Sequence, residues 1–93
     1  MKTLADFKRA LTLGSTWEAI NYLRPDNPLN LGIRQVSIKQ TNRVAFKTPS
    51  GNDSWLDFDK ADCYEFIDNN IVKCYWGDDD KRLIMQYRLI QGA

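Results

Sequence analysis

The sequence predicts an α+β fold, with one N-terminal helix packed on a strongly twisted antiparallel β meander of five to seven strands, curled enough to approach a small barrel. Two observations point to the layout. The apolar period changes at Gly14 from about 3.6, typical of a helix, to 2, typical of strands. Short alternating segments then follow, separated by turns of a few residues. The length of 93 residues, with 43% hydrophobic and 27% charged side chains, is typical of a single domain over residues 1–93.

The helix is expected over residues 3–13. Thr3 can cap its N-terminus, and Asp6 lies in the first turn, where the helix dipole favours an acid. Three apolar residues share one face, at i, i+3 and i+7: Leu4, Phe7 and Leu11. Gly14 suits a left-handed residue at the C-terminal cap. A helix this short must pack on the sheet to be stable.

The segments after Gly14 alternate as strands do. Residues 24–32 are expected to form a loop, because they hold two prolines, two asparagines and a glycine. The expected strands lie at 15–23, 33–40, 43–48, 54–58, 63–67, 71–76 and 81–90. In the last of these, one face is expected to carry Leu83, Met85, Tyr87 and Leu89.

The stretch "SWLDFDKADCYEF" raises the question of a metal or acid–base site at Asp57, Asp59 and Asp62. A calcium loop starting at Asp57 needs an oxygen ligand at its fifth position and glycine at its sixth, but Ala61 and Asp62 stand there. Acidic residues that flank turns or face solvent explain the pattern more simply. A metal-dependent hydrolase using this cluster is kept as an alternative. The three acids at 78–80 are expected to form a solvated hairpin tip.

Catalytic apparatus is missing from the sequence. The chain has no histidine, the commonest general base, and no glycine-rich phosphate loop. Cys63 and Cys74 lack zinc or CxxC spacing and are expected to be free thiols. The protein is therefore expected not to be an enzyme and to use no cofactor or metal.

A basic hairpin and one tryptophan are the candidate partner-contact residues. If Leu56 faces the core, Trp55 faces outward, either covered by another element or part of a contact patch. Lys39, Arg43 and Lys47 are expected on the outward side of neighbouring strands, which is the basis for a second alternative, a nucleic-acid-binding small β-barrel. The pI of about 7.7 is well below the roughly 9 typical of dedicated nucleic-acid binders, so a protein partner is favoured.

The cytoplasm is the expected compartment. The first residues carry no apolar run long enough for a signal peptide, and no stretch approaches the roughly 18 apolar residues of a membrane span. Two cysteines are too few for a secreted disulfide scaffold. No membrane association is expected.

Four segments, "LADFKRALTLGSTW", "IRQVSIKQTNRVAFKT", "SWLDFDKADCYEFID" and "RLIMQYRLI", resemble a group of small uncharacterised bacterial proteins often encoded on plasmids, phages and other mobile elements. That group is expected to carry proline where this chain has Asp59. The resemblance implies no catalytic residues, and it implies a protein that works by binding. The predicted function is thus a small non-enzymatic binding protein acting on a bacterial or phage macromolecule, with an anti-defence (anti-CRISPR-like) inhibitor as one form.

Overall fold

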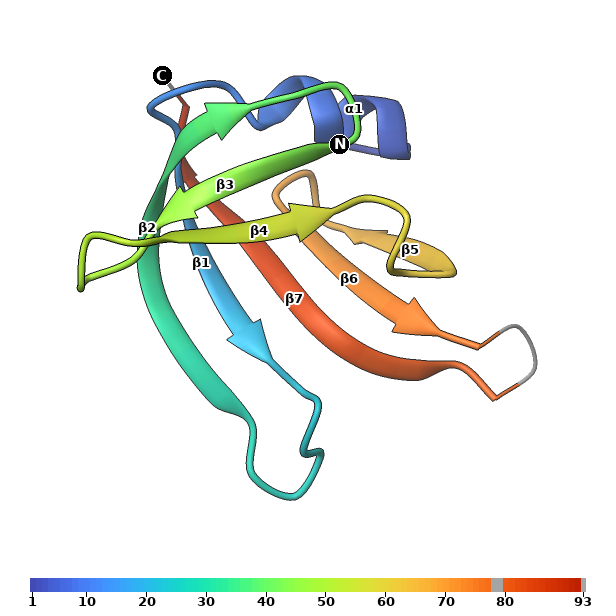
Figure 1. Cartoon of the computed structure of the whole chain (residues 1–93). Coiled ribbons are helices and arrows are strands. Elements are labelled where there is room, and N and C mark those ends of the chain that lie inside the picture. Colours follow the sequence, from blue (N-terminus) through green and yellow to red (C-terminus); the bar gives the residue numbers. More distant parts are fainter. Residues whose placement is uncertain (78–79, 93) are drawn as a thin grey trace.

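The computed structural model describes residues 1–77 and 80–92 and shows a short helix covering one end of a curled antiparallel sheet, a half-barrel (Figure 1). The elements are α1 (Leu4–Ala10), β1 (Thr16–Asn21), β2 (Leu29–Lys39), β3 (Arg43–Lys47), β4 (Asp53–Asp57), β5 (Cys63–Ile67), β6 (Ile71–Trp76) and β7 (Arg82–Gln91). The strand order is β4-β3-β2-β1-β7-β6-β5, so β4 and β5 are the sheet edges. The predicted α+β class is confirmed, with seven strands in the described residues and a sheet that curls without closing.

Helix α1 starts as predicted and ends earlier. The Thr3 hydroxyl accepts a hydrogen bond from the backbone N–H of Asp6, and the Asp6 carboxylate accepts one from the backbone of Thr3, forming a capping box. The helix stops at Ala10, with Leu11 as its C-cap, so the predicted end at residue 13 is wrong. Gly14 does have a positive φ of 85°, but it turns the chain into β1 and donates to the carbonyl of Val36 instead of capping the helix.

The closed end of the half-barrel is built around Phe7, which α1 inserts between the strands. Its ring lies 5.6 Å from that of Trp17 and about the same distance from three further aromatic rings. Those three rings belong to Phe58, Tyr64 and Tyr87, at 6.1, 6.2 and 6.0 Å. Because aromatic side chains bury large areas, this cluster supplies much of the core.

A buried polar pair supports this core. Ser15 is fully buried, and its hydroxyl donates to the carbonyl of Thr12 at 2.6 Å. The same oxygen accepts the indole N–H of Trp17 at 2.9 Å. The only polar atom of the buried Trp17 side chain therefore has its partner.

Two strand predictions need correction. Residues 29–32 belong to β2, not to a loop, because Leu29 and Asn30 pair with the end of β1. In β7 the structure buries Ile84, whereas the alternation had placed Leu83 on the core side. The cause is a register shift opposite Cys74 and Tyr75 of β6, which breaks the two-residue period. Of the acidic hairpin tip predicted at 78–80, residues 78 and 79 lie outside the described residues.

The alternation expected at Trp55 and Leu56 is present in β4, where Leu56 is buried and Trp55 is 36% exposed. Phe58, just after β4, is buried in the same core. In β3, Ala45 is fully buried, although it lies outside the main core cluster. It pairs with Trp55 of β4.

Candidate functional site

The basic hairpin of β2 and β3 does not bring its three cationic side chains together in one cluster. Lys39 donates from Nζ to the carbonyl of Lys8 at 2.8 Å, at the C-terminal end of α1, where a cation is favoured. Lys47 forms an ion pair with Asp53 of β4, with 3.1 Å between Nζ and Oδ1. Hydrogen bonds from Lys47 and then from Ser37 hold the pKa of Asp53 below its usual value. Both lysines thus have partners within the chain.

Trp55 lies at the rim of the cavity described below, with its ring beside the third cation. Its side chain is 36% exposed, and the guanidinium carbon of Arg43 lies 3.9 Å from its ring centroid. Arg43 also donates from Nε to Gln40, and it lies opposite Asp57 in the register of β3 and β4. Single-stranded nucleic acids bind to unpaired cations beside open aromatic faces, so this surface gives the nucleic-acid alternative little support.

The carboxylates of the opening stretch have separate environments. Asp57 pairs with Lys60 at 3.4 Å, and Asp62 accepts the backbone N–H of Gly77 at 2.7 Å. Asp59 is exposed in the turn. In the part of the chain that the structure describes, no group of three or more Asp, Glu, Cys or His side chains could hold a metal ion. The structure therefore does not bring these three carboxylates together as a metal site.

The cysteines lie on neighbouring strands without facing one another. Cys63 lies opposite Tyr75, and Cys74 lies opposite Tyr64. Both thiols are free. Burial, with a smaller effect from Cys63, raises the pKa of the Cys74 thiol to about 12. Cys74 is therefore protonated at neutral pH and is a poor nucleophile.

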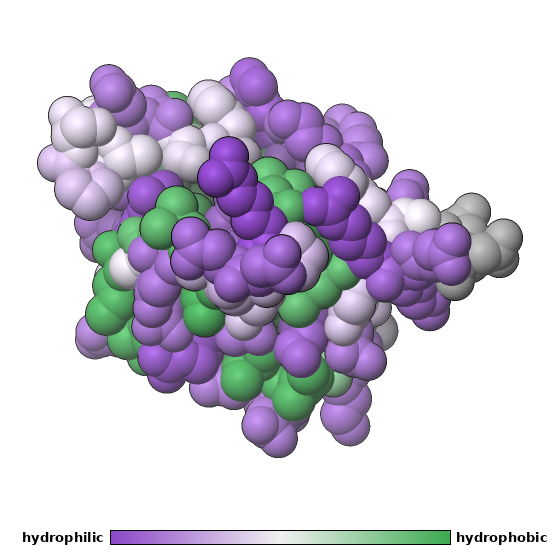
Figure 2. Space-filling model, turned by 90° about the horizontal axis from the view of Figure 1, so that it is seen from below, coloured by the Kyte–Doolittle hydropathy of each residue, from purple (hydrophilic) through white to green (hydrophobic). Residues whose placement is uncertain are grey.

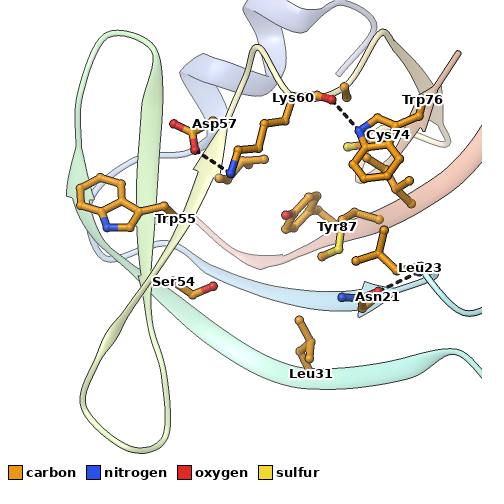
Figure 3. Close-up of a pocket in the computed structure, with 14 residues that line it drawn as sticks. Asn21, Leu23, Leu31, Ser54, Trp55, Asp57, Lys60, Cys74, Trp76 and Tyr87 are labelled. Carbon is orange, nitrogen blue, oxygen red and sulfur yellow. Dashed lines mark hydrogen bonds and ion pairs between the residues drawn. The ribbon is translucent and has the colours of Figure 1, made fainter.

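A cavity of about 320 Å³ lies at the open end of the half-barrel, away from α1 (Figure 3). Side chains from β1, β2, β4, β6 and β7 line it, together with the connection from β4 to β5. Its apolar wall includes Leu31, Leu56, Ala61, Trp76, Ile84 and Met85. The mouth of a β-barrel is a common place for a ligand site, and apolar walls are usual there.

Exposed apolar side chains surround the mouth. Leu23 and Trp76 both line the cavity, yet they are 41% and 40% exposed. A shallower depression adjoins it, sharing Asn21 and Leu23 and reaching the exposed Leu29. Seen from below, hydrophobic side chains form separate green patches between hydrophilic ones (Figure 2). The mouth therefore offers a few local apolar contacts.

Hydrogen bonds hold the connection between the two edge strands over one side of the cavity. The indole N–H of Trp76 donates to the carbonyl of Lys60 at 2.6 Å. The hydroxyl of Tyr64 donates to the carbonyl of Phe58 at 2.7 Å. These bonds attach residues 58–60 to β5 and β6. They hold this part of the cavity wall in place.

A β-bulge directs Leu31 into the cavity. Ala19 pairs with Gly32 and Ile20 pairs with Asn30, so Leu31 is the extra residue of β2. Gly32 adopts a positive φ of 80°, which glycine tolerates best. Figure 3 shows Leu31 pointing from β2 into the space beneath Tyr87.

Little charge reaches the cavity interior. Lys60 and Asp57, the lining residues with formal charges, pair with each other. Burial raises the pKa of the Tyr87 hydroxyl, so this group is neutral at physiological pH. The interior thus suits a neutral, mostly apolar occupant.

Sequence reasoning did not find this cavity, because it depends on how far the sheet curls. Strand alternation identifies the inward face, but not which inward side chains leave a gap. One local signal was present: Gly32 lies within an otherwise strand-like run, as glycines at bulges often do.

No helix within residues 1–77 and 80–92 is long and apolar enough to cross a membrane. Comparisons of the chain with protein families, with curated proteins and with solved structures find no match.

Proposed function

We propose that the protein is a non-enzymatic binding protein and that its binding site is the cavity at the open end of the half-barrel. The observation that carries this proposal is the apolar cavity of about 320 Å³, whose mouth is flanked by the exposed Leu23 and Trp76. An apolar cavity of about 150 Å³ already accommodates benzene, so this one has room for a substituted ring.

The chemistry of the lining supports binding over catalysis. The nearest nucleophile, the Cys74 thiol, has its pKa raised to about 12 by burial. The chain has no histidine to act as a general base. Lys60 and Asp57, at the edge of the cavity, form an ion pair with each other. None of these groups is prepared for proton or group transfer at neutral pH.

A fluorescence titration with 1-aminonaphthalene tests the proposal, because its emission rises and shifts to shorter wavelength in an apolar site. The expected result is saturable binding of one molecule per chain. Leu31→Phe should weaken binding at least about tenfold, because the larger side chain fills the cavity. The matched control is Ile33→Phe on the same strand, which adds the same ring at an exposed position and should leave binding unchanged.

A second cavity-filling variant guards against a folding artefact. Ala61→Leu narrows the same cavity from the β4–β5 connection. Circular dichroism melts establish that each variant is folded. Non-saturable binding, or equal affinity in all folded variants, would contradict the proposal.

A second candidate keeps the sequence expectation of a bacterial or phage macromolecule as the partner. The three exposed apolar side chains at the mouth, Leu23, Leu29 and Trp76, favour it, because such residues often anchor protein contacts. The test is affinity capture from a bacterial host, with and without nuclease, followed by mass spectrometry. A partner held after nuclease by the wild type and by Ile33→Ser, but lost from the Leu23→Ser/Leu29→Ser variant, is the expected result. Equal capture by all three proteins would argue against this surface.

A further inference from the structure

Three polar groups line the cavity without hydrogen-bond partners among the described residues. They are the Tyr87 hydroxyl, the Ser54 hydroxyl and the Asn21 amide nitrogen. Tyr87 is only 6% exposed, and its hydroxyl is not among the fully buried atoms, so it opens onto the cavity. A hydroxyl with no protein partner in an apolar lining is available to donate to a ligand in the cavity.

The orientation of Asn21 is fixed by the backbone. Its Oδ1 accepts the N–H of Leu23 at 2.8 Å, so Nδ2 is the side of the amide that stays available. Asn21 therefore presents a donor to the cavity.

Tyr87 and Ser54 face the same space from opposite walls. Figure 3 shows the hydroxyl of Tyr87, on β7, and that of Ser54, on β4, pointing into the gap between these strands. Phe46 stacks on the Tyr87 ring, with 5.8 Å between centroids and 9° between planes, which fixes the ring.

Resting on the function proposed above, we infer that the ligand of this cavity is a compact, neutral, mostly apolar molecule with a carbonyl-type oxygen. The Tyr87 hydroxyl and the Asn21 Nδ2 group donate to that oxygen, and Ser54 adds a third hydrogen bond. Leu31, Ile84 and Met85 hold the apolar body. A carboxylate fits poorly, because the lining offers it no unpaired cation.

Three probes of similar shape separate the contributions of a carbonyl oxygen and of a negative charge to the affinity. Acetophenone carries the carbonyl oxygen, α-methylstyrene replaces it with a methylene group, and benzoate carries a negative charge. Their dissociation constants are measured by displacement of 1-aminonaphthalene and checked by the ligand-induced rise in melting temperature. Acetophenone should bind about tenfold more tightly than α-methylstyrene, the value expected for one or two net hydrogen bonds. Benzoate should bind more weakly than both.

Tyr87→Phe should remove the preference for acetophenone and leave the affinity for α-methylstyrene unchanged. Without ligand, this variant should melt at or above the wild-type temperature, since the lost hydroxyl has no partner. Tyr75→Phe is the matched control, because the Tyr75 hydroxyl bonds to Glu65 outside the cavity. It should keep the preference.

Equal binding of acetophenone and α-methylstyrene would overturn this inference and leave the proposed function standing. So would a preference that survives in Tyr87→Phe, or tightest binding of benzoate. If neither the fluorophore nor any of the three probes binds, the proposed function falls and this inference falls with it.

Discussion

The two ends of the half-barrel use the same sheet in opposite ways. At the closed end, α1 fills the space: Phe7 and Leu11 are fully buried, and the indole N–H of Trp17 finds Ser15. At the open end no element among the described residues fills the space, so apolar side chains stay exposed and the hydroxyls of Ser54 and Tyr87 have no partners there. The closed end is therefore expected to provide most of the stability, and the open end is where we propose that a ligand binds.

Removing the central ring of the closed end should have the largest effect. Phe7→Ala leaves a void among four aromatic rings and should lower the free energy of unfolding by about 3–5 kcal/mol. Urea denaturation followed by tryptophan fluorescence measures this loss. Leu13→Ala, at an exposed position just after α1, should change it by less than about 0.5 kcal/mol. A loss below about 1 kcal/mol for Phe7→Ala would show that the helix is not the main support.

A pair of serine substitutions compares the ends directly. Ser15→Ala leaves the buried indole N–H of Trp17 without its acceptor and should cost about 1–3 kcal/mol. Ser54→Ala removes a hydroxyl that has no partner and should leave stability nearly unchanged. Chemical denaturation of both variants checks this. Equal losses in the free energy of unfolding for the two variants would contradict the difference between the two ends.

Substitutions at two glycines with positive φ distinguish the energetic cost of backbone strain from an effect on the shape of the binding site. Gly32→Ala and Gly51→Ala each place a side chain at a left-handed position, φ 80° and 89°, and should cost about 1–2 kcal/mol. Only Gly32 shapes the bulge that directs Leu31 into the cavity. We therefore expect weaker 1-aminonaphthalene binding in Gly32→Ala alone. Unchanged binding in that variant would remove the bulge from the account of the site.

The smallest effect is expected at the helix cap. Hydrogen bonds to its carboxylate, that from the Lys2 backbone first, lower the pKa of Asp6 from the usual 3.8. A group with a depressed folded-state pKa stabilises the fold above its unfolded value and loses that contribution as pH falls through the folded one. Asp6→Asn should thus be slightly less stable than wild type at pH 7, with the difference vanishing below about pH 4. Melting temperatures across this range test it, and a difference that grows in acid would contradict the sign.

Local chemistry made several elements predictable. Thr3 and Asp6 mark the start of α1 because a capping box involves only neighbouring residues. Alternation alone placed Leu56 and Trp55 on opposite faces, and the structure agrees, with Leu56 buried and Trp55 36% exposed. The partner of Lys39 was not predictable, since Lys8 lies 31 residues away on α1.

Two of the errors have a cause in non-local strand pairing. The start of β2 and the burial of Ile84 depend on pairing and register shifts, which a two-residue period cannot reveal. The cavity depends on the curl that brings β4 near β6 and β7. Neither the register shifts nor the curl of the sheet can be predicted from a single segment of the sequence.

An amide NMR titration tests the central claim most directly. Uniformly ¹⁵N-labelled protein is titrated with acetophenone, and the shift of each backbone amide is followed to saturation. We predict that the largest changes fall at the open end, around Leu31, Cys74 and Met85, with little change at Phe7 and Leu11. Largest changes around Lys39, or along α1, would contradict it.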